Sequence, residues 1–129
     1  MSGPTEYLDL DDLLALARRL LGDPPPIRDA GLLAAAVVRP QTSVAGRDAY
    51  PDVWTKAAAL LQSLVNGHPL VDGNKRLAWL ATAVFLELND ASVAEASNDA
   101  VYDLVMAVAG GSPDVDEIAA ALRALRPEE

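Results

Sequence analysis

One apolar run constrains the fold more than any other part of the chain. It begins at Leu77 and continues almost unbroken to Leu88, with Trp79, Phe85 and aliphatic residues between. A helix that is apolar on nearly every face is buried, whereas a surface helix carries only an apolar stripe. At about a dozen residues the run is well short of the ~20 needed to span a bilayer. We therefore predict a central core helix from about Gly73 to Leu88.

Five further segments show apolar residues at helical spacing between start and stop signals. The expected helices run from Asp9 to Gly22, from Asp29 to just before Pro40, from about Asp52 to Asn66, from Ser97 or Asn98 to Gly110, and from Asp114 through Leu125. Gly67 is expected to end the third helix. Residues 23–26 should be a stiff proline spacer, residues 41–50 a polar connection, and residues 91–96 a short extended piece. The pattern predicts an all-α fold, a compact bundle of about six helices around a central buried helix, in one domain over residues 1–129.

The composition supports this fold and excludes several classes of function. The chain is 51% hydrophobic but only 5% aromatic, which favours packed helices rich in Leu, Val and Ala. A net charge of −9 repels nucleic-acid backbones, so no direct nucleic-acid binding is expected and any phosphate site must be local. The absence of cysteine excludes disulfides and thiolate metal sites. The N-terminus shows neither a basic nor an apolar signal region, so we expect a cytoplasmic protein without membrane contact.

The nine residues before the apolar run concentrate the reactive side chains. Residues 68–76 read His-Pro-Leu-Val-Asp-Gly-Asn-Lys-Arg. His68 is the only histidine, and because imidazole titrates near neutrality it is the natural general base for an attacking hydroxyl. Asp72 has two interpretations: it holds Mg²⁺, which prefers carboxylate oxygens, or it caps the next helix.

The start of the predicted core helix has the properties of an anion site. Gly73 and Asn74 open the helix, where free N–H groups and the positive end of the macrodipole attract phosphate. Lys75 and Arg76 add two formal charges, which are unfavourable there unless an anion binds. Neighbouring helical residues project about 100° apart, so the two cations are expected to serve different phosphates, or one a phosphate and the other an internal carboxylate. No P-loop or protein-kinase glycine loop accompanies the site, and a single histidine disfavours a zinc hydrolase.

The spacing His-Pro-x-x-Asp-Gly-Asn-Lys-Arg resembles the signature loop of the Fic superfamily. Lys75, where most adenylyl-transferring members have a second glycine, resembles the Doc (death-on-curing) toxin branch. The likeness spans roughly residues 8 to 125 and is also carried by Arg39-Pro40-Gln41, Tyr50-Pro51, Lys56-Ala57-Ala58, Phe85-Leu86 with Asn89, and the helix starting at Val115. The resemblance implies the Fic/Doc fold, ATP and Mg²⁺ as cofactors, His68 as catalytic residue, Asp72 as metal ligand, and Gly73, Asn74, Lys75 and Arg76 as nucleotide ligands.

Lys75 also separates the possible reactions. In adenylyl-transferring relatives the glycine leaves room for the β- and γ-phosphates, whereas the Doc-like arrangement binds the nucleotide reversed and transfers the terminal phosphate. The resemblance thus implies a toxin of a toxin-antitoxin system, a kinase of a protein Ser/Thr hydroxyl whose target class is elongation factor Tu, so that it inhibits translation. A Fic-type adenylyltransferase and a non-catalytic nucleotide- or peptide-binding module with an idle loop remain the alternatives.

The chain departs from the family pattern in three places. Leu70 replaces the phenylalanine that anchors the loop, so a less rigid loop is expected, and Leu77 stands where Doc relatives commonly have threonine. No stretch resembles the inhibitory helix of many Fic proteins, which predicts a separate antitoxin covering the apolar groove between helices. In relatives the region matching residues 42–50 is a flap that lays the target segment beside the loop, and an ordinary surface loop is the alternative here.

Overall fold

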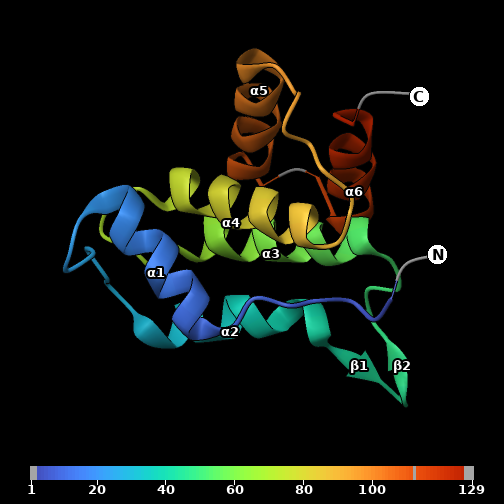
Figure 1. Cartoon of the computed structure of the whole chain (residues 1–129), viewed down its shortest axis with the longest axis horizontal. Helices are drawn as coiled ribbons and strands as arrows, with labels where there is room; N and C mark the ends of the chain where they lie inside the picture. Colours follow the sequence, from blue (N-terminus) through green and yellow to red (C-terminus); the bar gives the residue numbers. More distant parts are fainter. Residues whose placement is uncertain (1–2, 112, 127–129) are drawn as a thin grey trace.

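Six α-helices form the computed structural model of the chain, which describes residues 3–111 and 113–126. They are α1 (Leu10–Leu21), α2 (Ala30–Val38), α3 (Val53–Gly67), α4 (Asn74–Leu88), α5 (Asn98–Ala109) and α6 (Val115–Ala124). A short 3₁₀ helix, η1 (Arg39–Gln41), follows α2, and β1 (Ser43–Val44) pairs antiparallel with β2 (Arg47–Asp48). The prediction of a compact six-helix bundle is confirmed (Figure 1).

Short polar side chains start all of these helices except one. The side chains of Asp9, Asp29, Asp52, Ser97 and Asp114 each accept a hydrogen bond from a backbone N–H in the first turn of their helix. These side chains satisfy donors that have no acceptor within the helix. Helix α4 instead begins after Gly73, which supplies no side-chain cap.

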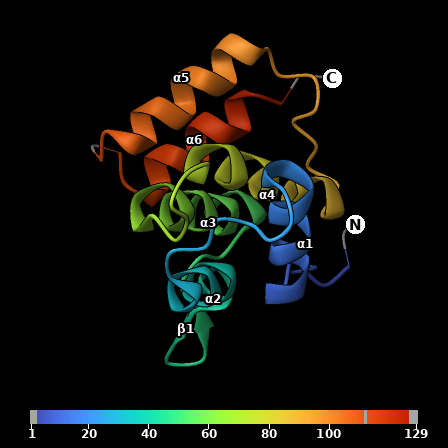
Figure 2. The same cartoon turned by 90° about the vertical axis from the view of Figure 1, so that its left-hand side faces the viewer.

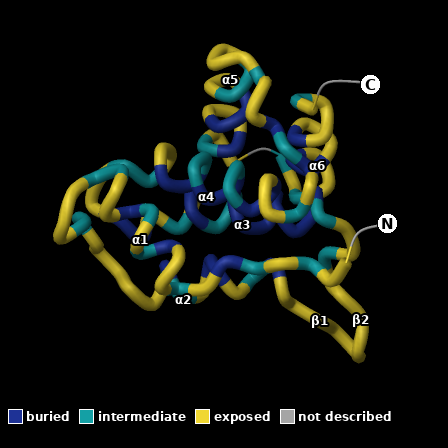
Figure 3. Tube along the Cα trace, viewed as in Figure 1, coloured by how far each residue is buried: buried dark blue, intermediate teal, exposed yellow. Residues whose placement is uncertain are grey.

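Helix α3, rather than α4, is the centre of the bundle. Ten of its fifteen residues are buried, compared with six of fifteen in α4. It contacts α2, α4, α5, α6 and η1, and Figure 3 shows the buried trace following α3 and the adjoining side of α4. The prediction that residues 73–88 form the central helix was therefore wrong: α4 lies to one side of α3, so its Trp79, Ala83 and Val84 are only partly buried. None of the helices described is both long and apolar enough to cross a bilayer.

Two connections differ from their prediction. The polar connection 41–50 contains the hairpin β1–β2, which projects beyond α2 at the end opposite α5 and α6 (Figure 2). The buried Lys56 of α3 anchors this hairpin, because its Nζ donates to Asp48 Oδ2 at 3.1 Å and to the carbonyl of Tyr50. Residues 91–96 form no strand; the chain turns there instead, with the N–H of Ala96 donating to the carbonyl of Val93.

Candidate active site

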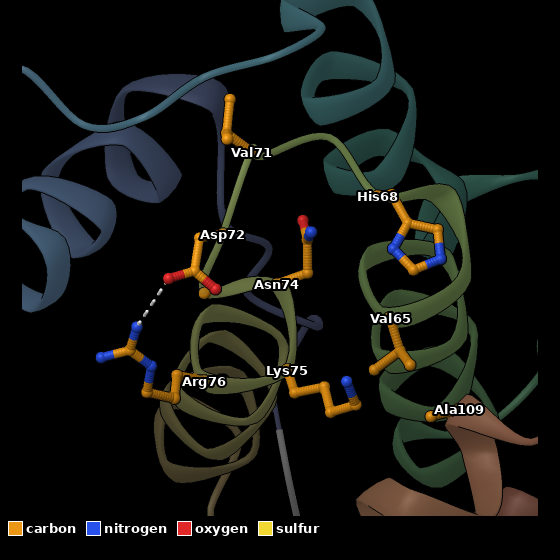
Figure 4. A pocket seen from close by; sticks show the side chains of 9 residues that line it. Val65, His68, Val71, Asp72, Asn74, Lys75, Arg76 and Ala109 are labelled. Carbon is orange, nitrogen blue, oxygen red and sulfur yellow. Dashed lines mark ion pairs between the residues drawn. The ribbon is translucent and has the colours of Figure 1, made fainter.

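A short loop joins the C-terminal end of α3 to the N-terminal end of α4 and creates a cavity of about 380 Å³ between them. All the residues predicted for the site line this cavity, together with one further residue each from α3, the loop and α5. The lining comprises Val65, His68, Val71, Asp72, Gly73, Asn74, Lys75, Arg76 and Ala109 (Figure 4). The fold thus brings the predicted base, carboxylate and cations to one place, while their roles stay predictions.

His68 ends α3 in the left-handed backbone conformation, with φ 52° and ψ 54°. We predicted a helix to about Asn66 with Gly67 as its stop signal. Instead Gly67 is still helical and His68 is the residue that stops the helix, so that prediction was wrong by one position. Histidine is among the few residues other than glycine that are enriched in this region of backbone space. The turn leaves His68 exposed at the end of α3, beside the cavity (Figure 4).

Gly73 starts α4 and is also left-handed, with φ 86°. A Cβ at this position would lie 2.7 Å from Cδ2 of Leu21, at the end of α1. The backbone conformation therefore favours glycine, and any side chain here would also have to displace the end of Leu21. Gly73, not Asp72, occupies the N-cap position of α4, and no side chain caps the first turn. The predicted alternative in which Asp72 caps α4 is therefore not realised.

The two cations of the α4 terminus lie on different sides. Arg76 Nη2 is 3.9 Å from Asp72 Oδ2, and both side chains are largely exposed, so this ion pair is weak. Lys75 forms no ion pair with the residues that the structure describes and extends toward Val65 and Ala109 (Figure 4). Of the two arrangements predicted for these cations, Arg76 therefore matches the pairing with an internal carboxylate, whereas Lys75 is directed toward the α3 side of the site.

Asn74 holds the loop through its side chain. Its Oδ1 accepts from the Leu70 N–H at 2.9 Å, and its Nδ2 donates to the Leu70 carbonyl at 3.0 Å. Leu70 itself is only 1% exposed, so the smaller residue still anchors the loop in the core. Since both ends of the Asn74 amide are engaged, its backbone N–H is the group that this arrangement leaves for an anion.

Sequence reasoning missed Arg28. Its Nε donates to the carbonyl of His68 at 2.8 Å, and a terminal nitrogen donates to the carbonyls of both His68 and Gly67. The two partners are 40 positions apart, and no spacing rule in the sequence connects them. The connection between α1 and α2, which contains Arg28, therefore also contacts the end of α3.

Comparison with known proteins agrees with this site. Residues 7–86 match the profile of the Fic/DOC family, which is more than half of the chain and includes the whole loop. The chain is 51% identical over 119 residues to Toxin Doc of Mycolicibacterium smegmatis, and the match covers 92% of each protein. The chain belongs to the Fic/DOC family. The resemblance inferred from residues 68–76 is thereby confirmed, and this Fic/DOC protein is a homologue of a Doc toxin.

The carboxylate of this Fic/DOC site fits a magnesium ion held jointly with a ligand. The Asp72 side chain is 88% exposed, and within the described part of the chain its only ion-pair partner is Arg76, at 3.9 Å. No group of three His, Cys, Asp or Glu residues within residues 3–111 and 113–126 could hold a metal. Mg²⁺ in nucleotide sites commonly uses one or two carboxylates, phosphate oxygens and water. Asp72 matches that type of site and not a closed protein cage.

Proposed function

We propose that this protein is a Doc-type toxin of a toxin-antitoxin system. In this proposal it is a kinase that transfers the terminal phosphate of ATP to a Ser or Thr hydroxyl of a protein of the elongation factor Tu class, and so inhibits translation. The name and 51% identity of the Doc relative support the toxin assignment. The observation that carries the chemistry is an uncapped helix terminus with two cations, facing a histidine across one cavity.

The α4 terminus supports binding of the nucleotide phosphates. The N–H groups of its first turn have no acceptor within the helix and no side-chain cap, and the macrodipole places about half a positive charge there. Lys75 and Arg76 raise the positive charge further, at a helix end where cations are unfavourable without an anion. Gly73, Asn74 and Lys75 are therefore proposed as phosphate ligands, and Arg76 as a further one once a phosphate replaces its weak, exposed contact with Asp72. Such fixed charges and N–H groups are the main source of catalysis in phosphoryl transfer.

His68 supports the role of general base on the opposite side. The target hydroxyl oxygen forms a bond to the γ-phosphorus, the bond from that phosphorus to the β-phosphate oxygen breaks, and ADP leaves. The proton of the hydroxyl passes to the imidazole of His68, which is exposed and so accessible to a protein side chain. Mg²⁺, when bound, offsets the charge of the phosphates, and Asp72 is the residue proposed to hold it.

The position of Lys75 favours phosphoryl over adenylyl transfer. Its side chain extends from α4 toward Val65 and Ala109, across the part of the cavity that a glycine would leave open (Figure 4). A lysine there occupies space and adds charge, and both effects favour placing the transferred terminal phosphate, not the β- and γ-phosphates of a leaving group, beside α4. Adenylyl transfer remains the second candidate reaction.

A groove beside the site supports an antitoxin partner. It has a volume of about 560 Å³ and lies between α2 and α3, lined by Leu32, Ala35, Ala36, Val38, Arg39, Thr42, Gln62, Ser63, Asn66 and Gly67. It extends from the base of the β1–β2 hairpin to the residue preceding His68. Val38 is 56% exposed along it, so an apolar segment would remove that side chain from water. We propose that the antitoxin covers this groove and that the hairpin presents the target segment.

Intact mass spectrometry tests the reaction directly. The purified protein is incubated with MgCl₂, ATP and elongation factor Tu, and the His68→Ala variant serves as the control. A gain of roughly 80 Da on the target, absent with the variant, is expected for one phosphoryl group. A gain of roughly 329 Da would replace the kinase by an adenylyltransferase. An unmodified target, with a growth defect that persists in the variant, would favour the binding module.

A further inference from the structure

The segment Pro26–Asp29, here called the brace, runs antiparallel to the site loop. Ile27 and Leu70 form an isolated bridge between the two segments. The backbone hydrogen bonds that join them are those from Val71 N–H to the Pro26 carbonyl at 2.8 Å, from Arg28 N–H to the Pro69 carbonyl at 2.8 Å, and from Asp29 N–H to the same carbonyl at 2.9 Å. The brace is fixed at its far end because Asp29 caps α2. The site loop is therefore held from outside by a segment of the chain about 40 residues upstream.

Arg28 is the centre of the brace. Its backbone N–H holds the carbonyl of Pro69, and its guanidinium holds the carbonyls of His68 and Gly67. One residue thus fixes three consecutive peptide groups around the proposed base. The chemistry favours arginine here, because the last carbonyls of a helix have no donor within the helix and a positive charge is stabilised at that end.

These contacts fix the conformation that directs the imidazole. The left-handed region is sparsely populated for residues with a side chain, and such a residue stays there only when its surroundings hold it. At His68 the carbonyl that follows the left-handed φ is the one that receives two bonds from Arg28. Loss of the Arg28 side chain removes both of these donors and leaves the backbone bonds of the brace to Pro69 and Val71, so the left-handed conformation of His68 is held less firmly.

We infer that Arg28 is a positioning residue that holds the proposed general base in place for proton transfer. The inference rests on the proposed function of His68. A base must lie within hydrogen-bond reach of the proton that it accepts, and a misplacement of about 1 Å costs up to 10²-fold in rate. Arg28 does not line the cavity, so it acts through His68 and not on a substrate.

The kinetic test compares three variants in transfer from γ-labelled ATP to elongation factor Tu. Arg28→Ala is expected to lower kcat about 5- to 20-fold while KM for ATP stays within about twofold, because the α4 side of the site is unchanged. Arg28→Lys keeps the charge but loses the planar fork, and should restore part of the rate. Arg123→Ala, which removes an exposed arginine of α6, should match the wild type. An unchanged kcat in Arg28→Ala overturns the inference.

A measurement without substrate separates this inference from the proposed reaction. The backbone scalar coupling of His68 in solution NMR reports its φ angle, which is 52° in the structure. Arg28→Ala should change that coupling, whereas Arg123→Ala should preserve it. If Arg28→Ala keeps the wild-type coupling, or loses activity only in proportion to a fall in Tm, the positioning role is excluded. If the wild type transfers no phosphate but the coupling changes as expected, the proposed function fails and the positioning of His68 stands.

Discussion

The two helix ends that meet at the site are completed in opposite ways. At the end of α3, the carbonyls of Gly67 and His68 receive hydrogen bonds from Arg28. At the start of α4, no side chain caps the helix, and two cations, Lys75 and Arg76, lie in its first turn, with only the exposed Asp72 close to Arg76. The end completed by the protein carries His68, the proposed general base. The end left incomplete is the one that an anionic ligand would complete.

Both ends also use a left-handed residue, but for different reasons. At Gly73 an added Cβ would lie 2.7 Å from the terminal Cδ2 of Leu21, so a side chain there would have to displace that end of Leu21. At His68 the conformation is adopted by a residue with a bulky ring, and hydrogen bonds from another segment compensate for it. The contrast fits the proposal that the His68 side chain serves as the general base, whereas at Gly73 the backbone conformation itself favours glycine.

The largest expected effect is on the His68 side. His68→Ala should lower phosphoryl transfer by about 10²-fold or more, while the Kd for ATP changes by less than about twofold, because the base makes no proposed contact with the phosphates. His68→Asn is the matched control, since asparagine also adopts the left-handed region but cannot act as the base. Labelled-ATP transfer and calorimetric ATP binding measure the two quantities. Substantial activity in His68→Asn would show that only the backbone turn matters.

On the other side, the effect of Gly73→Ala should be on folding. Gly73→Ala should lower the free energy of unfolding in urea by about 1–2 kcal/mol because of the left-handed φ. The displacement of Leu21 should lower it by about 1–3 kcal/mol more. Gly46→Ala separates the two costs, because Gly46 also has a positive φ, 79°, and a Cβ there would meet no heavy atom within 4 Å. In this variant the free energy of unfolding should fall by only about 1–2 kcal/mol, the cost of the left-handed φ. An equal decrease in the free energy of unfolding in the two variants would mean that displacing Leu21 has no energetic cost.

The difference between the two ends also explains what the sequence could predict. Local signals were sufficient for the helix starts: Asp9, Asp29 and Asp114 cap the helices that they were predicted to cap. The spacing of residues 68–76 predicted the family, and all of these residues except Pro69 and Leu70 line one cavity. The α4 terminus was predictable because its glycine, cations and apolar run are contiguous in the chain.

The end of α3 was not predictable in the same way. Glycine is the commonest residue to end a helix, so local reasoning chose Gly67, whereas the hydrogen bonds that permit a left-handed His68 come from Arg28. The same limit applies to the centre of the fold. The apolar run of α4 is the most continuous, but α3 is more buried because it has neighbours on more sides. Tertiary contacts decided both questions.

A smaller effect is expected for Lys75. Lys75→Ala should raise KM for ATP about tenfold, equivalent to about 1.4 kcal/mol, because an exposed ammonium contributes less than a buried charge-assisted hydrogen bond. Arg123→Ala makes the same change in net charge away from the site and should leave KM unchanged. Added salt should reduce the difference between the two variants, because it screens exposed charges. Equal KM values at low salt would remove Lys75 from the phosphate site.

The smallest expected effect on stability is at Asp72. Because Asp72 does not cap α4 and its ion pair with Arg76 is exposed, Asp72→Ala should change the free energy of unfolding by no more than about 0.5 kcal/mol. Asp114→Ala is the matched comparison, since Asp114 Oδ1 accepts from the Glu117 N–H at 2.9 Å in a true cap, and its loss should cost about 1 kcal/mol. The Mg²⁺ concentration for half-maximal transfer should nevertheless rise several-fold in Asp72→Ala alone. A loss of stability equal to that of Asp114→Ala, with unchanged Mg²⁺ dependence, would restore the capping interpretation and leave α4 without its proposed metal ligand.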